Sequence, residues 1–292
     1  NGLHTISPDA HGSASMRVLA LSPGPVQDQL DRLPALAAVA EELGAMVQVA
    51  CDPTCRAAWE LLPGFEKLIP FSFESNPSLA DWTNLLGCVR EPDFQACLNF
   101  ADGQSVNLML SMSHIPTRVA LSGFASTVRI TLEQGWAAQR VAPFVEALGC
   151  SLKADDFRLT LPSQALETAR AELPSGDGPL LLMAPSGGSN DWPNQRWSTL
   201  PETIRSRLKT LRSQSLPPGL KLAQRAAAVA CADVVLSSCR LTQLLAVYSN
   251  VPLVALGGPA SDLPERAEIR CLGGDGPLEA IGEDEVLTAL GF

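Results

Sequence analysis

One acidic residue, Asp28, follows the first strand-like segment of the chain and stands where a carboxylate can act on a ligand. Residues 16–21 are an apolar, β-compatible run, residues 22–27 break it, and residues 29–44 have helical periodicity. In an open α/β sheet, the loop after a strand is a common ligand-binding position. A carboxylate within reach of a hydroxyl there can serve as a general base. Asp is also a frequent helix N-cap, so a purely structural role for Asp28 is the alternative.

A second loop has the composition of a phosphate-binding turn. Ser186, Gly187 and Gly188 follow the apolar run 180–185, and Trp192 comes shortly after them. Backbone N–H groups in such a loop can cradle a phosphate, although Gly-Gly is equally typical of a tight turn. Trp192 can stack on a base or a sugar, or it can pack the loop onto the helix that follows.

The elements that position these loops alternate between strands and helices. We expect strands at 16–21, 46–51, 65–71, 94–100, 117–121, 180–185, 233–237 and 252–256. We expect helices at 29–44, 54–62, 79–90, 105–111, 136–148, 163–172, 195–208, 223–232, 241–249 and 280–292, the last of them packing back on the first domain. This alternation predicts an α/β fold of two Rossmann-like, doubly wound domains with parallel sheets that face a cleft.

Length and local composition suggest where the domains divide. The chain has 292 residues, 46% of them hydrophobic, which is enough for two cores. Residues 1–15 are polar and aperiodic, so we interpret them as a leader, either an added remnant, a native extension or the tail of a targeting peptide. A Pro/Gly/Ser cluster then ends a linker at 161–178. We therefore expect an acceptor-side domain at 16–160 and a donor-side domain at 179–292.

Charge and cysteine content exclude several classes of function. The net charge of −10 argues against nucleic acid and anionic membrane surfaces as partners. No apolar run reaches the roughly 20 residues of a membrane span. Six of the eight cysteines lie in or beside apolar segments and are typical of small buried hydrophobes in the cytoplasm or another reducing compartment, such as an organelle stroma if the leader is targeting-derived. The pair Cys51 and Cys55 has no second ligand pair, so we expect no metal and no cofactor.

Three segments together resemble a known family. They are the Asp28 loop with residues 33–36 (LPAL), residues 185–188 (PSGG) with Trp192-Pro193 and Arg196-Trp197, and residues 232–235 (ADVV) continuing to 250–259 (NVPLVALGGP). In order and spacing they resemble glycosyltransferase family 9, the ADP-heptose:lipopolysaccharide heptosyltransferases, over most of residues 16–275. The resemblance implies a GT-B fold in which the C-terminal domain holds most of the nucleotide-sugar donor.

The resemblance also assigns roles, and this chain departs from several of them. Asp28 matches the family's proposed base, whereas Gln27 replaces the Gly before it. The family has a phosphate-contacting Lys two residues before Trp-Pro, and Asn190 stands at that position with Asp191 beside it. A carboxylate repels a diphosphate that a Lys would neutralise.

The third family element, Asp-Ser/Thr-Gly-x-x-His, lies at a helix N-terminus that favours phosphate. Its counterpart is residues 238–243, in which the Asp, the Gly and the His are all replaced. Arg240 can meet a phosphate bidentately, but it also fills the space that the family's Gly leaves open. The candidate donor-binding residues implied by the resemblance are Ser186, Gly187, Gly188, Asn190, Trp192, Ser238, Cys239, Arg240 and Gln243.

The family also has a further strand and helix where this chain has only the polar residues 209–222. We expect no strand or helix there, because the domain is shortened or because a segment is missing from the sequence. Two functions are compatible with these departures. One is a heptosyltransferase-like protein with a degenerate donor site, acting as a non-catalytic binding or assembly/scaffold protein with a protein partner. The other is an active inverting glycosyltransferase that moves a sugar from a nucleotide-sugar donor, such as an ADP-sugar, to a glycan or lipopolysaccharide acceptor with Asp28 as general base.

Overall fold

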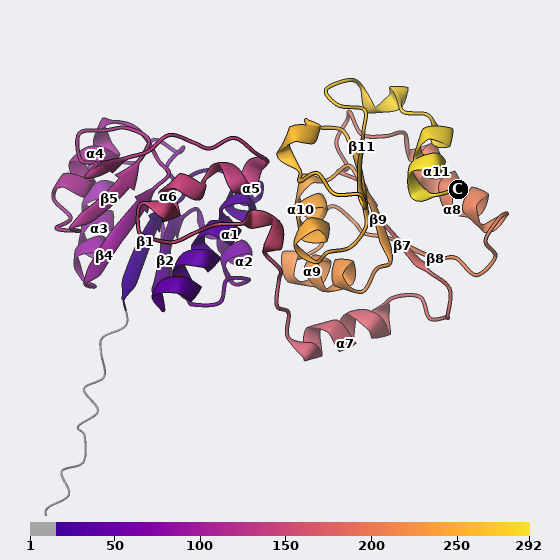
Figure 1. The fold of residues 1–292 in the computed structure, drawn as a ribbon, viewed down its shortest axis with the longest axis horizontal. Coiled ribbons are helices and arrows are strands. Elements are labelled where there is room, and N and C mark those ends of the chain that lie inside the picture. Colours follow the sequence, from indigo (N-terminus) through magenta and orange to yellow (C-terminus); the bar gives the residue numbers. More distant parts are fainter. Residues whose placement is uncertain (1–15) are drawn as a thin grey trace, which may run out of the picture.

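The computed structural model describes residues 16–292, and the predicted leader at 1–15 lies outside them. Two α/β units lie side by side, each built on its own parallel sheet (Figure 1). The predicted pair of Rossmann-like domains is therefore confirmed. None of the helices in residues 16–292 combines the length and apolar character needed to cross a membrane.

The N-terminal sheet has the order β3-β2-β1-β4-β5-β6, and all of its strands are parallel. Its strands are β1 (Arg17–Leu21), β2 (Met46–Cys51), β3 (Phe65–Pro70), β4 (Phe94–Asn99), β5 (Thr117–Ala120) and β6 (Val128–Arg129). The central strands β1 and β2 are almost fully buried, as their apolar sequences require. The strand order reverses between β1 and β4, so the loop after β1 lies at a switch point of the sheet.

The helices of this domain are α1 (Val26–Leu43), α2 (Arg56–Trp59), α3 (Leu79–Arg90), α4 (Gln104–Ser111), α5 (Ala137–Arg140) and α6 (Ala142–Glu146), with 3-10 turns η1 (Pro53–Cys55) and η2 (Ala154–Asp156). The single helix predicted at 136–148 is divided into α5 and α6. Pro143 is the second residue of α6, and because it has no backbone N–H it belongs in a first turn rather than inside a continuous helix.

The C-terminal sheet has the order β11-β10-β9-β7-β8 and is also parallel. Its strands are β7 (Leu180–Ala184), β8 (Arg212–Ser215), β9 (Val234–Ser237), β10 (Leu253–Leu256) and β11 (Ile269–Leu272). Its helices are α7 (Ser163–Glu172), α8 (Asn194–Arg205), α9 (Leu222–Ala230), α10 (Arg240–Tyr248) and α11 (Glu283–Leu290), with 3-10 turns η3 (Ala260–Asp262) and η4 (Leu278–Ala280). The segment 161–178 that we expected as a linker carries α7, which packs against α9.

Two expectations for this domain are wrong. Residues 209–222, where we expected no strand, contain β8, which pairs with β7 alone and closes that edge of the sheet. Its sequence, RSQS, is polar because a partly exposed edge strand needs no apolar run. The final helix α11 packs against α8 and β10 rather than against the N-terminal domain. Val286 and Leu287 bury their side chains in the same core as Trp192 and Trp197.

The two domains meet where α1 packs against α10. The hydroxyl of Tyr248 in α10 donates a hydrogen bond to the Leu30 carbonyl oxygen in α1 over 2.6 Å. In a regular helix that carbonyl would accept from the N–H four residues on, but the residue there is Pro34, which has none. Tyr248 therefore supplies from the other domain the donor that α1 lacks. Burial holds the pKa of Tyr248 well above its ordinary value, which keeps the hydroxyl a donor.

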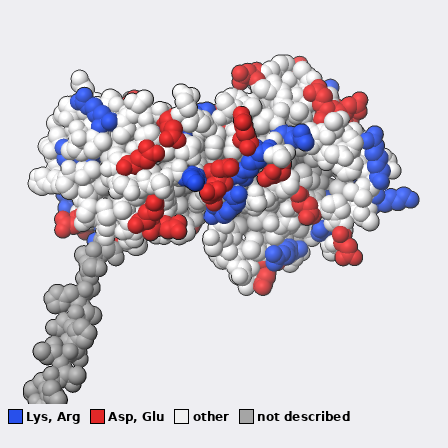
Figure 2. Space-filling model, in the orientation of Figure 1, with Lys and Arg blue, Asp and Glu red and all other residues white. Residues whose placement is uncertain are grey.

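Charged side chains add to this junction at the surface. Arg266 pairs with Asp155 over 2.6 Å, and Arg140 pairs with Asp262 over 2.8 Å. Figure 2 shows acidic and basic side chains side by side where the two domains meet. The domains are thus held together by a buried hydrogen bond, by continuous apolar packing and by surface ion pairs.

Candidate functional site

Asp28 is the third residue of α1 and lies in the first turn of this helix, which follows β1 after a short loop. The helix begins at Val26, earlier than predicted, and its N-cap is Pro25, so the alternative that Asp28 caps the helix is wrong. The carboxylate is partly exposed and forms no ion pair within residues 16–292. An acidic group in a first helical turn also interacts favourably with the helix dipole. No observation tests Asp28 as a base, and its catalytic role stays a prediction.

The loop that carries Asp28 is fixed from below by a buried glutamine. The Gln29 amide oxygen accepts hydrogen bonds from Ser22 Oγ over 2.6 Å and from Trp59 Nε1 over 2.9 Å. Its nitrogen donates to the carbonyl oxygens of residues 22, 23 and 24 over 2.9–3.1 Å. Because each polar group of Gln29 is used, the path of the chain between β1 and α1 is rigidly set.

A half-buried arginine lies beneath the same loop. Arg32 donates to Ser22 Oγ over 2.8 Å and to the Pro23 carbonyl, and its guanidinium lies 5.1 Å from the centre of the Phe100 ring. Burial lowers the pKa of Arg32, and the carboxylates Asp28 and Asp31 oppose that change. Arg32 therefore supplies positive charge to both acids without forming a close ion pair with either.

Asp31 was not among the predicted site residues, yet its pKa is the most perturbed of the carboxyl groups at the junction. Burial raises its pKa to about 7; Arg240 opposes the rise, whereas Asp28 and Asp262 add to it. Its Oδ1 atom is buried and has no hydrogen-bond partner in residues 16–292. The spacing of three residues from Asp28 places both acids on one face of α1, and that spacing is the signal that could have found it.

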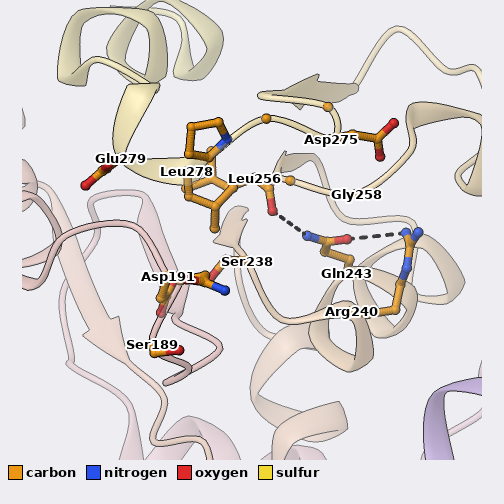
Figure 3. A pocket seen from close by; sticks show the side chains of 15 residues that line it. Ser189, Asp191, Ser238, Arg240, Gln243, Leu256, Gly258, Asp275, Leu278 and Glu279 are labelled. Atoms are coloured by element: carbon orange, nitrogen blue, oxygen red, sulfur yellow. Dashed lines mark hydrogen bonds between the residues drawn. The ribbon is translucent and has the colours of Figure 1, made fainter.

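A cavity of about 640 Å³ opens at the carboxyl ends of the C-terminal strands (Figure 3). Four of the predicted donor residues line it: Asn190, Ser238, Arg240 and Gln243. Its opposite wall is the loop after β11, which the sequence did not predict and which contributes residues 274–279. Ser186, Gly187, Gly188, Trp192 and Cys239 are not among its lining residues. The structure thus brings four of the nine predicted donor residues to one cavity.

The Asp191 side chain lies in the loop between β7 and α8 and accepts hydrogen bonds from that loop and from the loop after β9. One carboxylate oxygen, Oδ2, accepts from the Gly187 N–H over 3.1 Å. The other, Oδ1, accepts from the Trp192 N–H over 2.7 Å and from the Ser238 hydroxyl over 2.5 Å. Ser238 Oγ also accepts from the Ser186 N–H over 2.9 Å. The two loops that the resemblance assigns to phosphate are therefore joined through a carboxylate.

Arg240 is the cation in the cavity wall, and its guanidinium already has partners. Its Nη2 lies 3.1 Å from Asp262 Oδ2, and its Nη1 lies 3.4 Å from Gln243 Oε1. Gln243 is held in turn by the carbonyl oxygens of Ser237 and Leu256, to which its nitrogen donates over 2.8 and 3.5 Å. Figure 3 shows the chain of hydrogen bonds from Leu256 through Gln243 to Arg240.

Trp192 does not reach the cavity. Its ring is buried against Trp197, with ring centres 5.1 Å apart in an edge-to-face arrangement, and Nε1 donates to the Ile281 carbonyl over 2.9 Å. These contacts correspond to the packing alternative for this residue, in which the indole anchors the loop on α8 and on the segment before α11.

Solved structures of glycosyltransferases resemble the chain along almost its whole length. The family 9 glycosyltransferase from Veillonella parvula DSM 2008 gives a TM-score of 0.72 at 15% identity, covering 94% of this chain and 95% of that one. E. coli ADP-heptose LPS heptosyltransferase II gives 0.69 at 18% identity, covering 94% and 97%. The chain has the heptosyltransferase fold. E. coli heptosyltransferase WaaC with ADP-2-deoxy-2-fluoro heptose gives 0.65 at 16% identity, covering 94% and 99%.

No protein-family model and no curated protein sequence matches the chain. The identities to the solved structures are low, so the likeness concerns the heptosyltransferase fold and not the reaction. The predicted GT-B architecture is confirmed at that level. What the site can do has to be argued from its own side chains.

Proposed function

We propose that this chain is a heptosyltransferase-like, non-catalytic binding or assembly protein whose C-terminal cavity does not hold a nucleotide diphosphate. The observation that carries the proposal is the balance of charge in the cavity wall. Asp191, Asp275 and Glu279 line it, and Arg240 is the one Lys or Arg among the lining residues. That arginine is already paired with Asp262, so it offers a phosphate little free positive charge.

This charge balance works against a diphosphate. Two like charges about 4 Å apart repel by roughly 4 kcal/mol at the effective dielectric of a protein surface. A phosphate-binding site normally offsets such repulsion with charge-assisted hydrogen bonds from Lys, Arg or free backbone N–H groups. Here the Gly187 N–H is bound to Asp191, and Asn190 stands where the resemblance implies a Lys. The cavity wall therefore presents a diphosphate with three carboxylates against one arginine that is already paired.

Titration calorimetry tests the proposal with ADP and ADP-heptose as ligands. WaaC, whose structure is described with ADP, serves as the positive control. We expect no measurable binding at millimolar ligand while circular dichroism reports an intact fold. A micromolar dissociation constant for either ligand would contradict the proposal and favour a transferase.

If the protein acts in an assembly, its apparent mass in native extract should exceed that of the single chain. The chain alone has a mass of 30.9 kDa. We expect it to migrate in native extract as part of a larger complex, from which a tagged copy retrieves a defined protein partner. Migration as a lone chain, together with turnover of ADP-heptose, would overturn it. The buried cysteines support a reducing compartment, such as the cytoplasm or an organelle stroma, as the location.

The active inverting transferase is the second candidate, and the position of Asp28 favours it. The carboxylate lies partly exposed near the end of β1, so it has the freedom a general base needs. In this case the chain would transfer the sugar of an ADP-sugar to a hydroxyl of a glycan or lipopolysaccharide acceptor and release ADP. Asp28→Asn should then abolish turnover, whereas Asp156→Asn, at an exposed carboxylate in η2, should leave it unchanged.

A further inference from the structure

The hydrogen bonds around Asp191 have the form of an occupied anion site. Three donors converge on one carboxylate: two backbone N–H groups, from Gly187 and Trp192, and the hydroxyl of Ser238. They come from two loops, one after β7 and one after β9, which are 47 residues apart in the chain. Backbone N–H groups and hydroxyls that converge from neighbouring loops are the usual means by which proteins bind phosphate oxygens.

Of these donors, the Ser238 hydroxyl lines the cavity, and there the Asp191 carboxylate competes directly with an external anion. Gly187 adopts a left-handed conformation with φ of 77°, which turns its N–H toward Asp191. Once the N–H bonds to the carboxylate, it is not free for a ligand oxygen. The negative charge that satisfies it would also repel any phosphate that approached.

We propose that Asp191 is a built-in anion that occupies the phosphate position of this loop, and that the cavity consequently selects uncharged, hydroxyl-bearing ligands such as a nucleoside over their phosphates. The inference rests on the proposed function, because it takes the cavity to be a former donor site. It goes further by naming the residue that excludes phosphate and the class of ligand that remains.

The rest of the cavity wall fits an uncharged ligand with hydroxyl groups. Asp275 and Glu279 carry carboxylates, which accept hydrogen bonds and cannot donate when ionised, so a ligand must supply the donors. Leu278, which is partly exposed, provides apolar surface for a ring (Figure 3). A nucleoside supplies both features without a phosphate, and 640 Å³ is within the usual range for such a site.

The substitution Asp191→Asn tests the proposal because it removes the charge and keeps the shape. The amide oxygen of Asn can still accept from Trp192 N–H and Ser238 Oγ, while the N–H of Gly187 loses its acceptor and becomes free. We expect Asp191→Asn to bind ADP at least about tenfold more tightly than the wild-type chain, since the substitution removes a negative charge from the cavity wall. Affinity for adenosine should change by less than about threefold, because adenosine carries no phosphate.

Asp275→Asn is the matched control, because it removes one carboxylate from the same wall but not from the anion position. It should change the affinity for ADP by less than about threefold. An equal gain in both variants, or no gain in Asp191→Asn, would overturn the proposal. If Asp191→Asn does not fold, as judged by circular dichroism, Asp191→Ser offers a smaller neutral side chain for the same measurement.

Two quantities separate this inference from the proposed function. The absolute affinity of the wild-type chain for ADP tests whether the donor site is degenerate. The ratio of ADP affinities between Asp191→Asn and the wild type tests Asp191 alone. A wild-type chain that binds ADP at micromolar concentration contradicts the proposed function even if the ratio is large, and a ratio near one contradicts the role of Asp191 even if the wild type binds nothing.

Discussion

Replacing Asp31 by Asn should stabilise the protein above neutral pH and leave it unchanged in acid. Asp31 lies on α1 against α10, and the charged groups around it are Arg240, Asp28, Asp262 and Arg32. Burial of the carboxyl raises its pKa from 3.8 to about 7, so its ionised form is unfavourable in the folded state. An Asn side chain of nearly the same shape never ionises and avoids that cost.

The direction of the effect follows from proton linkage. Below about pH 4, both the folded and the unfolded chain carry a protonated Asp31, and the wild type and the variant should be equally stable. As the pH rises toward 7, the unfolded chain releases the proton more readily than the folded one, and the wild type loses stability relative to the variant. Above the folded pKa the difference is constant.

The size of the effect follows from the shift in pKa. Each pKa unit corresponds to 1.36 kcal/mol, so a shift of about three units gives roughly 4 kcal/mol. Solvent reaches part of the side chain, which lowers the expected gain to about 2–4 kcal/mol at pH 8. Urea unfolding followed by circular dichroism at pH 4 and pH 8 measures it. The control is Asp177→Asn, at an exposed residue of the segment 161–178, which should leave the stability unchanged at both pH 4 and pH 8. A gain in Asp31→Asn that is the same at pH 4 and pH 8 would refute the reasoning.

Two further substitutions test the packing. Tyr248→Phe removes the donor to the Leu30 carbonyl and leaves that oxygen buried. Urea unfolding should therefore show a free energy of unfolding that is lower by about 1–3 kcal/mol. An unchanged unfolding midpoint would mean that the hydrogen bond contributes nothing to stability. Gly178→Ala would place its Cβ 1.8 Å from the Thr210 carbonyl oxygen. We expect its free energy of unfolding to fall by about 1–3 kcal/mol, or the variant to be insoluble. Gly219→Ala, with no atom within 4 Å of its Cβ, is the control and should be as stable as the wild type.

The sequence predicts most of the fold because its local signals agree with its long-range packing. The helix expected at 79–90 is α3 with the same bounds. Its N-cap is Ser78, whose capping box with Asp81 is a local signal. The buried strands are continuous apolar runs and were found for that reason. The polar edge strand β8 was missed, because its place depends on the backbone of β7 and not on its own side chains.

The site was less predictable because its decisive contacts join distant segments. The resemblance located Asn190 and Arg240 at the cavity, but residues 274–279 entered it only through the position of β11. The pairing of Asp191 with Ser238 depends on the adjacency of β7 and β9 in the sheet. Asp31 became notable only once α10 was packed against α1. The spacing from Asp28 places Asp31 on the same face of α1, but no spacing within the sequence specifies which distant element packs against that face.

The missing N–H of Pro34 bears on how far the two domains can move. If α10 drew away from α1, the Leu30 carbonyl could not turn to a donor within its own helix, and only water could replace Tyr248. Opening the interdomain angle would therefore cost a buried hydrogen bond that closing it restores. The chain has a single tyrosine, so an isotope label placed in tyrosine reports on this contact alone. A ligand that changes the distance between Asp28 and the C-terminal cavity by such a motion has to offset the loss of this hydrogen bond.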